Sequence, residues 1–357
     1  MSKKRTKLSC IFNAAKNKSA PFQNLSQPKQ IGLKMTNIIN FNDIEKRKEA
    51  SATPLEKVSL QQEITRQQCT LKAEVLCEAL PYMRKFAGET FVIKFGGSAM
   101  GGDNNLRNFA KNVVLLKQVG INPIVVHGGG PQIGQMLAKL NIKSSFIDGL
   151  RVTDSDTVDV VEMVLAGSIN KMIVKEINAA AGKAIGISGK DANLIRAKRL
   201  TRTKKDPDSN IEKILNLGFV GEPYFVDPDV LSVFEDSDII PVIAPIGIGD
   251  NGETFNINAD TAAGAIAAAI HASKLIILSD VDGVMLPNGE LVSHLNIATA
   301  RQMITDGVIT GGMIPKIETC ISALEGGVAY THILNGAVDN ILLMEIFTES
   351  GAGTMII

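Results

Sequence analysis

Two stretches, VIKFGG at residues 92–97 and VVHGGG at residues 125–130, each place glycines directly after a short apolar segment. Glycine loses more backbone freedom on folding than any other residue, so a run of it in this position requires a reason. A strand that ends in glycines and leads into a helix presents N–H groups and the positive end of the helix dipole to an anion. Each stretch alone is equally consistent with a tight strand-to-helix turn. Two in succession favour a pair of anion-binding turns for a phosphorylated substrate.

Apolar strand-like segments and helical segments alternate around these two stretches, as they do in parallel α/β proteins. No internal repeat of fixed period interrupts this order. We expect strands at 91–95, 122–126, 184–188, 239–246, 274–279, 331–336 and 354–357, helices at 103–120, 131–140, 155–180, from 261, 301–307 and 316–325, and a hairpin around 217–223.

The composition favours a small-molecule partner. The chain has 357 residues, enough for two lobes or one large α/β domain. Its 37 basic and 37 acidic residues balance, so we expect no nucleic-acid partner, and no window is apolar enough to predict a membrane helix. The four cysteines show no metal-ligand spacing and suit a reducing cytoplasm, and of four scattered histidines only His127 adjoins a motif. The cysteine spacing therefore disfavours a structural metal site.

The N-terminal part differs from the rest. Residues 1–34 carry eight Lys or Arg and no Asp or Glu, a composition that favours disorder. This segment is either a transit peptide, which would indicate a plastid, or sequence upstream of a start at Met35. We assign 1–60 to a disordered extension and 61–88 to an amphipathic helical arm, which either packs on its own core or binds a partner.

The glycine stretches match neither the GxxxxGK[ST] phosphate loop nor the GxGxxG dinucleotide fingerprint. Lys94 instead lies on the strand before the first glycine turn, and Lys316 follows another glycine pair in TGGMIPK. Phosphoryl transfer mainly requires positive charge and N–H donors around the moving phosphate. Two lysines from opposite ends of the chain would supply that charge, although an isolated lysine is usually a solvated surface residue.

Two further segments carry candidate polar groups. In FNINAD, residues 255–260, Asn256, Asn258 and Asp260 occupy alternate positions, so Asp260 could hold the two lysines or merely cap the following helix. Arg151 in DGLRVTD is suited to a bidentate grip on a carboxylate, although it could also be a surface residue.

With these residues in view, the chain resembles the amino acid kinase family, most closely its arginine-sensitive members that phosphorylate N-acetyl-L-glutamate. The likeness covers about residues 65–357 and is carried by VIKFGGSAM, NPIVVHGGGPQIG, IDGLRVTD, ISGKDANLI, FNINADTAAGAIA, LSDVDGV, TGGMIPK and FTESGAGTMI. It implies a three-layer αβα sandwich around an open, mostly parallel sheet. It also implies an amino-acid substrate lobe at 89–246 and, at 247–357, a nucleotide lobe with a C-terminal effector region.

The family pattern implies roles for individual residues. The reaction it implies is transfer of phosphate from MgATP to the γ-carboxylate of N-acetyl-L-glutamate, the second step of arginine synthesis. Magnesium in the family is held mainly by phosphates and water, so the resemblance implies no protein metal ligand. The roles implied are catalysis for Lys94, Lys316 and Asp260, substrate binding for Gly128, Gly129, Arg151 and Asn256, and ATP binding for Gly96, Gly97, Asp280, Gly283 and Thr310.

The same resemblance implies regulation and assembly. The helical arm is similar to one that joins dimers into a hexamer, so we expect a homo-oligomer, either a dimer or a trimer of dimers. Tyr82, Glu345 and Gly351 are implied contacts for arginine as an inhibitor. Asn340 stands where that branch commonly has histidine. Its presence leaves the strength of inhibition open, as the sequence leaves any PII-type partner open.

Two alternatives remain at this point. Another member of the family, acting on glutamate or aspartate, would share the glycine turns and the lysines, but Arg151 within GLRVTD disfavours it. A non-catalytic regulator that binds arginine would have no reason to keep two costly lysines together.

Overall fold

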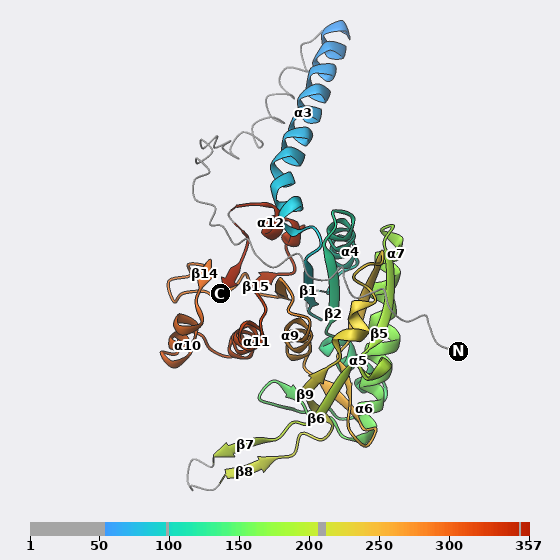
Figure 1. The fold of residues 1–357 in the computed structure, drawn as a ribbon, viewed down its shortest axis with the longest axis vertical. Coiled ribbons are helices and arrows are strands. Elements are labelled where there is room, and N and C mark those ends of the chain that lie inside the picture. The colour runs from blue at the N-terminus through green and yellow to red at the C-terminus, as the bar shows by residue number, and fades with distance from the viewer. Residues whose placement is uncertain (1–53, 98–99, 206–211, 350) are drawn as a thin grey trace, which may run out of the picture. The chain divides into compact units, whose positions relative to one another are not determined.

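The computed structural model describes residues 54–97, 100–205, 212–349 and 351–357 (Figure 1). The chain divides into two units, Met1–Lys72 and Ala73–Ile357. Most of the extension predicted at 1–60 lies outside the described residues, and the transit-peptide alternative lies there entirely. Helix α3 spans Pro54–Phe86, so it begins inside the range assigned to that extension and ends two residues before the end of the predicted arm.

The centre of the second unit is an eight-stranded sheet in the order β14-β16-β15-β13-β1-β2-β10-β5. Its described pairings are parallel except for β15 with β16. This arrangement confirms the predicted mostly parallel sheet. The strands are β1 Thr90–Phe95, β2 Asn122–His127, β5 Lys183–Ser188, β10 Ile239–Ala244, β13 Lys274–Ser279, β14 His294–Leu295, β15 Tyr330–Asn335 and β16 Thr354–Ile356.

Helices cover both faces of this sheet and create two apolar cores (Figure 1). Because neighbouring side chains on a strand point to opposite faces, Ile93 and Phe95 of β1 enter one core and Val92 enters the other. The predicted three-layer sandwich is therefore confirmed. The first core is covered by α4 Asp103–Gln118, α5 Gly130–Lys139, α7 Asn170–Ala179 and α12 Ile341–Phe347, and the second by α9 Ala259–Ala269, α10 Ile297–Thr305 and α11 Met313–Glu325.

The helix predicted at 155–180 is one helical segment with a change of winding. It consists of α6 Ser155–Glu162, the π-helix η1 Met163–Ile169 and α7. π-helical turns are rare and often mark functional sites, because the wider winding re-aims side chains. Here the π-helix places Leu165 and Ile169 against the second glycine turn.

Short strands form a small closed barrel and two ribbons beside the sheet. The barrel joins β6 Ile195–Arg199, β9 Val220–Val226, β11 Ile246–Ile248 and β12 Thr254–Ile257. The ribbons pair β3 Phe146–Ile147 with β4 Leu150–Arg151, and β7 Arg202–Lys205 with β8 Glu212–Leu215. Two short helices, η2 Asp191–Asn193 and α8 Pro228–Ser232, complete the elements named here.

The hairpin predicted around 217–223 is wrong in position. The hairpin lies upstream, in β7 and β8, and residues 220–226 form a barrel strand that pairs with β6. Gly218 has a positive φ of 70°, and a Cβ there would lie 2.0 Å from the Thr153 carbonyl oxygen. The glycine signal therefore reports a close crossing of two backbones.

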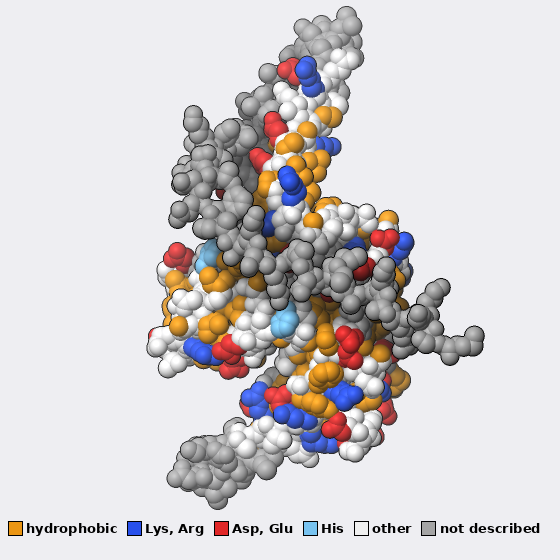
Figure 2. Space-filling view, in the orientation of Figure 1, with side chains coloured by type: hydrophobic (Ala, Val, Ile, Leu, Met, Phe, Trp, Pro, Cys, Tyr) orange, Lys and Arg blue, Asp and Glu red, His pale blue; other side chains and the backbone are white. Residues whose placement is uncertain are grey.

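Helix α3 carries apolar side chains on its surface within the second unit (Figure 2). Val75, Leu76 and Leu80 are 55%, 63% and 51% exposed. The alternative in which this face packs on the protein's own core does not hold for these three residues. None of the helices in the described ranges combines the length and apolarity that a membrane span requires.

Candidate active site

The two glycine turns lie against each other at the carboxyl edge of the sheet. The Gly128 N–H donates a 2.9 Å hydrogen bond to the Phe95 carbonyl, which joins the end of β2 to the end of β1. A Cβ on Gly97 would lie 3.3 Å from the backbone nitrogens of both Gly129 and Gly130. Only glycine permits this approach without a shift, so an anion bound by one turn lies beside the other.

The contact between the two turns determines which glycine N–H groups are available to a ligand. The Gly128 N–H is already used between the strands, whereas the Gly129 N–H donates to none of the described residues. Gly129 is also closely packed, because a Cβ there would lie 2.3 Å from Ile169 and 2.7 Å from Leu165. Of these two glycines, Gly129 is therefore the one whose N–H can be directed at a ligand.

Asp260 holds the two predicted lysines together. Lys94 Nζ lies 2.8 Å from Oδ1 and Lys316 Nζ lies 2.7 Å from Oδ2, and all three side chains are mostly buried. Burial would raise the pKa of Asp260, but the charges of Lys94 and Lys316 outweigh it and lower the pKa below its usual value. Burial also lowers the pKa of Lys94, against the opposing attraction of Asp260. The arrangement concentrates positive charge beside the glycine turns.

Asp260 is free for this role because another residue caps the helix. Asn258 is the N-cap of α9, and its side-chain oxygen accepts hydrogen bonds from the N–H groups of Asp260 and Thr261. The capping alternative for Asp260 is therefore wrong.

These groups line an open cleft of about 460 Å³. Of the predicted residues it brings together Lys94, Gly97, Gly128, Gly129, Arg151, Asn256, Asp260 and Lys316. Arg151 is 8% exposed, and its guanidinium donates to the Gly130 carbonyl at 2.9 Å and to Ser144 and lies 4.6 Å above the Phe146 ring. The surface alternative for Arg151 is wrong, and its remaining N–H donors are available to a carboxylate.

Asn256 is tied to Arg151 through one threonine. Its amide donates to the Thr153 hydroxyl at 3.2 Å, and that hydroxyl donates to the Arg151 carbonyl at 2.9 Å. The two polar groups on this side of the cleft are thus connected.

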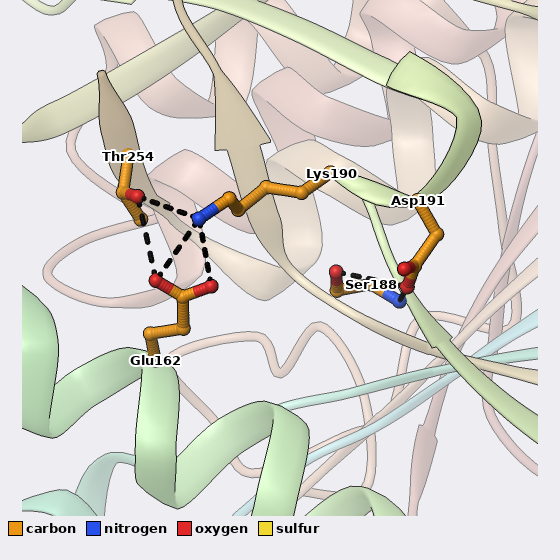
Figure 3. Close-up of polar contacts among 5 residues, drawn as sticks. All are labelled: Glu162, Ser188, Lys190, Asp191 and Thr254. Atoms are coloured by element: carbon orange, nitrogen blue, oxygen red, sulfur yellow. Dashed lines mark hydrogen bonds and ion pairs between the residues drawn. The ribbon is translucent and has the colours of Figure 1, made fainter. Parts of the chain in front are cut away.

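A lysine outside the cleft supports the same side (Figure 3). Lys190 donates to both oxygens of Glu162, at 2.9 and 3.2 Å, and to the Thr254 hydroxyl at 3.0 Å. Glu162 directly precedes the π-helix, and Thr254 opens the strand that carries Asn256. Lys190 therefore connects the π-helix to β12.

Apart from Gly97, the predicted nucleotide residues do not line this cleft. Asp280 is exposed, and its carboxylate accepts from the Ser279 hydroxyl at 3.1 Å. Gly283 has a φ of 152°, and a Cβ there would lie 2.5 Å from Thr354 Oγ1, so its backbone requires glycine. Thr310 is exposed and its carbonyl accepts from Met313. Gly96 directly precedes the lining residue Gly97. A nucleotide spanning these positions would extend beyond the cleft.

The predicted effector residues partly converge. A Cβ on Gly351 would lie 3.1 Å from Glu345 Oε2, and the neighbouring Ala352 N–H donates to that oxygen at 2.7 Å. The Glu345 Oε1 lies 2.7 Å from His332 Nδ1. Tyr82 packs on the first core, where burial, followed by the charge of Glu349, raises its pKa.

Several partners in these networks were not predicted. His332 also lies 3.0 Å from Lys274, whose pKa burial lowers to about 8. Ser144 and Thr153 support Arg151, and their hydroxyls carry no spacing signal in the sequence. The KLIILS strand offered one hint, because a lysine opens an otherwise apolar strand. Among the described residues, no cluster of three or more His, Cys, Asp or Glu could hold a metal ion.

A mostly parallel sheet with two glycine turns and two carboxylate-held lysines at its carboxyl edge defines a kinase for a small anionic acceptor. The chain belongs to the amino acid kinase family, because residues 89–335 match the model of that family. It is 63% identical over 285 residues, covering 80% of this chain and 92% of the relative, to a protein of Rhodospirillum rubrum named acetylglutamate kinase. A protein of Rhodospirillum centenum with that name is 58% identical over 292 residues, covering 82% and 96%.

Solved structures share this fold. The N-acetylglutamate synthase of Neisseria gonorrhoeae, complexed with coenzyme A and N-acetyl-glutamate, is similar with a TM-score of 0.68 and 28% identity. The match covers 80% of this chain but only 63% of the synthase chain. Carbamate kinase from Giardia lamblia, at 16% identity, has a TM-score of 0.54, covers 76% and 99%, and supports the fold alone.

Proposed function

We propose that this protein transfers the γ-phosphoryl group of ATP to the γ-carboxylate of N-acetyl-L-glutamate, forming N-acetyl-L-glutamyl 5-phosphate in the second step of arginine biosynthesis. The observation that carries the proposal is Asp260, which pairs with Lys94 and Lys316 at one side of the cleft while Arg151 lies in the same cleft. The names of the relatives support the choice of acceptor.

In the transfer, a carboxylate oxygen of the acceptor forms a bond to the γ-phosphorus while the bond to the bridging oxygen of ADP breaks. No proton has to move, since a carboxylate is already a nucleophile. Lys94 and Lys316 stabilise the charge on the phosphoryl oxygens, and Asp260 orients both lysines. The Gly129 N–H donates to an acceptor oxygen, and the first turn, Gly96 and Gly97, faces the phosphates of ATP.

Arg151 and Asn256 orient the acceptor. The guanidinium receives the α-carboxylate, because its remaining donors match two carboxylate oxygens. Asp280, Gly283 and Thr310 belong to the loops that contact the nucleotide. Magnesium, when bound, would neutralise part of the charge on the phosphates, and it would be held mainly by those phosphates. Both oxygens of Asp260 are paired with lysines, which supports coordination of magnesium mainly by phosphates.

Arginine inhibits the enzyme at Tyr82, Glu345 and Gly351 in this proposal. Glu345 is the group that would receive a guanidinium, and it already accepts hydrogen bonds from its surroundings. Asn340 has a left-handed φ of 56°, and its side-chain oxygen accepts a 2.9 Å hydrogen bond from the Asn112 amide. This bond fixes the orientation of the Asn340 side chain. An inhibited enzyme with this asparagine would show that histidine is not required.

The protein acts as a homo-oligomer, a dimer or a trimer of dimers, in the cytoplasm. The exposed apolar residues of α3 support association, because contiguous apolar surface is usually covered. The described cysteines are free thiols, which suits a reducing compartment.

The deciding experiment is steady-state turnover with ATP, magnesium and N-acetyl-L-glutamate, with the acyl phosphate trapped by hydroxylamine. Product from the wild-type protein is expected, and glutamate and aspartate should give far less. No product with acetylglutamate, or faster turnover with another amino acid, overturns the proposal. The same assay with millimolar arginine tests inhibition separately, and arginine binding without any turnover would favour the non-catalytic alternative.

A further inference from the structure

A buried polar pair lies directly beneath the second glycine turn and has no role in the chemistry described above. His127 and Asn170 are both 0% exposed. His127 precedes Gly128 on the chain, and Asn170 follows the π-helix whose Ile169 packs against Gly129. The pair thus connects the turn to the helix beside it.

The contacts of Asn170 fix which atom of its amide faces the histidine. Nδ2 lies 2.8 Å from the Val242 carbonyl oxygen and 3.2 Å from the Ile187 carbonyl oxygen. An amide oxygen in that position would face two other acceptors, so the nitrogen must occupy it. The same nitrogen lies 3.3 Å from His127 Nε2.

This orientation determines the tautomer of His127. An amide nitrogen cannot accept a hydrogen bond, so a proton on Nε2 would face it without a partner, whereas a proton on Nδ1 faces the Gly128 carbonyl oxygen. The ring proton of the neutral imidazole is therefore on Nδ1. Burial, which outweighs the hydrogen bond to Gly128, lowers the pKa of His127 to about 4, so the ring is neutral at physiological pH. Nδ1 lies 3.0 Å from the Gly128 carbonyl oxygen and donates to it.

The bond to that carbonyl controls the next N–H group. The peptide joining Gly128 to Gly129 is planar and trans, so its oxygen and its hydrogen point in opposite directions. Holding the Gly128 oxygen against the buried imidazole therefore turns the Gly129 N–H away from the interior. That N–H donates to none of the described residues, and Gly129 lines the cleft.

We propose that His127 is a positioning residue: its Nδ1–H holds the Gly128 carbonyl and so aims the Gly129 N–H at the acceptor carboxylate, with Asn170 selecting the required tautomer. This inference rests on the proposed function for the identity of the acceptor. A glycine turn has many accessible conformations, and the histidine restricts them to the one in which the donor faces the substrate.

The absence of a side chain at Gly186 leaves space for Asn170 beside His127. A Cβ at that position of β5 would lie 1.7 Å from Asn170 Oδ1, so any side chain displaces Asn170. A change at Gly186 therefore disturbs the pair without touching His127 or the cleft lining.

The experiment compares His127→Asn with His127→Gln in the full-length protein. The Asn amide nitrogen is as many bonds from Cα as histidine Nδ1, whereas the Gln amide nitrogen corresponds to Nε2. His127→Asn should keep kcat/KM for acetylglutamate within about three-fold of wild type. His127→Gln should lower it about 10- to 100-fold, less than the roughly 100- to 1,000-fold cost of deleting an aimed donor, because the N–H is misdirected but still present. KM for ATP should stay within about two-fold in both. Equal impairment of the two variants, or impairment of neither, overturns the proposal.

Thr331→Val is the matched control, because Thr331 is also 0% exposed and its hydroxyl donates a hydrogen bond to the Ile356 carbonyl. Both residues lie on strands toward the edge of the sheet opposite β5. It should alter Tm without altering the kinetics. If neither histidine variant folds, Gly186→Ala should show the same selective loss in kcat/KM for acetylglutamate, and wild-type kinetics in that variant refute the role of Asn170.

A measurement on the wild-type protein tests the geometry without any variant. Nitrogen-15 NMR of histidine-labelled protein should show His127 as a neutral Nδ1–H tautomer from pH 5.5 to 8. An Nε2–H tautomer, or titration near pH 6.5, overturns the inference. Failure of wild-type turnover would instead refute the proposed function and leave this tautomer test valid.

Discussion

Lys316 donates a 2.7 Å hydrogen bond to Asp260, although 56 residues separate them in the chain. The other oxygen of the same carboxylate lies 2.8 Å from Lys94. A carboxylate paired with a lysine at each oxygen has little capacity to act as a base, and phosphoryl transfer to a carboxylate requires none. The arrangement fixes two positive charges at one end of the cleft.

Lys316→Ala should lower kcat about 100- to 1,000-fold while KM for acetylglutamate changes less than about three-fold. The lysine charge matters most when the phosphoryl group carries its largest negative charge, which is in the transition state. Initial rates at saturating ATP measure both parameters. A large rise in KM with an unchanged kcat would contradict the role assigned to Lys316.

Arg151→Lys should raise KM for acetylglutamate about 10-fold or more, with a smaller effect on kcat. Lysine keeps the charge but loses the planar donors and the contacts to Gly130, Ser144 and Phe146. The kinetics with acetylglutamate as the varied substrate check this. KM for ATP is the internal control, and an equal rise there would place Arg151 outside the acceptor half of the site.

Gly129→Ala should reduce kcat/KM for acetylglutamate at least about 10-fold, because the new Cβ would lie 2.3 Å from Ile169 and must push the turn away from the π-helix. The matched control is Gly167→Ala in the same π-helix, where a Cβ meets nothing within 4 Å. That variant should retain activity. Wild-type kinetics in Gly129→Ala would show that the turn tolerates a shift of this size.

Lys190→Met should raise KM for acetylglutamate about three- to 10-fold and leave KM for ATP unchanged. The lysine joins Glu162 to Thr254, and these residues adjoin the π-helix and the strand of Asn256. The effect is modest because Lys190 is about one-third exposed, where solvent screens the ion pair. Lys198→Met, which removes a more exposed lysine 3.7 Å from Glu222, is the control and should leave both constants unchanged.

The sheet and the charged centre of the site could be predicted from the sequence because their signals are local. Apolar runs followed by glycines identify β1 and β2, and parallel strands bring their carboxyl ends to one edge. Lys94 lies inside the first of these signals, and Asp260 lies in the alternating polar pattern of FNINAD. The hairpin was predicted in the wrong place because Gly218 lies where two backbones cross closely. The sequence alone does not distinguish a glycine required by such a crossing from a glycine required by a hairpin turn.

The supporting residues could not be predicted because their partners are distant in the chain. Asn170 contacts His127, Ile187 and Val242, which belong to three different strands. Nothing in the residues around Asn170 distinguishes it from any other asparagine on a helix. The π-helix that precedes Asn170 also has no signal in the local sequence, since its side chains pack against Gly129, which is distant in the chain.

Because His127 is buried beneath the second glycine turn, the free energy of unfolding should decrease as pH is lowered through a defined range. The unfolded His127 binds a proton near pH 6.5, whereas the folded one binds it only near its pKa of about 4. Between these values the unfolded state binds more protons, so stability is fully present above pH 6.5 and is lost as pH falls toward 4. From pH 7 to pH 5 the loss attributable to His127 is about 2 kcal/mol.

Denaturant unfolding of wild type and His127→Asn at both pH values isolates this contribution, because carboxylates and the other histidines titrate alike in the two proteins. The wild type should lose about 2 kcal/mol more than the variant between pH 7 and pH 5. Equal losses would mean that folded His127 takes up its proton in the same range as the unfolded chain. In that case protonation of Nε2 in the native protein would set its N–H against the Asn170 amide, and the contact beneath the second glycine turn would have to open at mildly acidic pH.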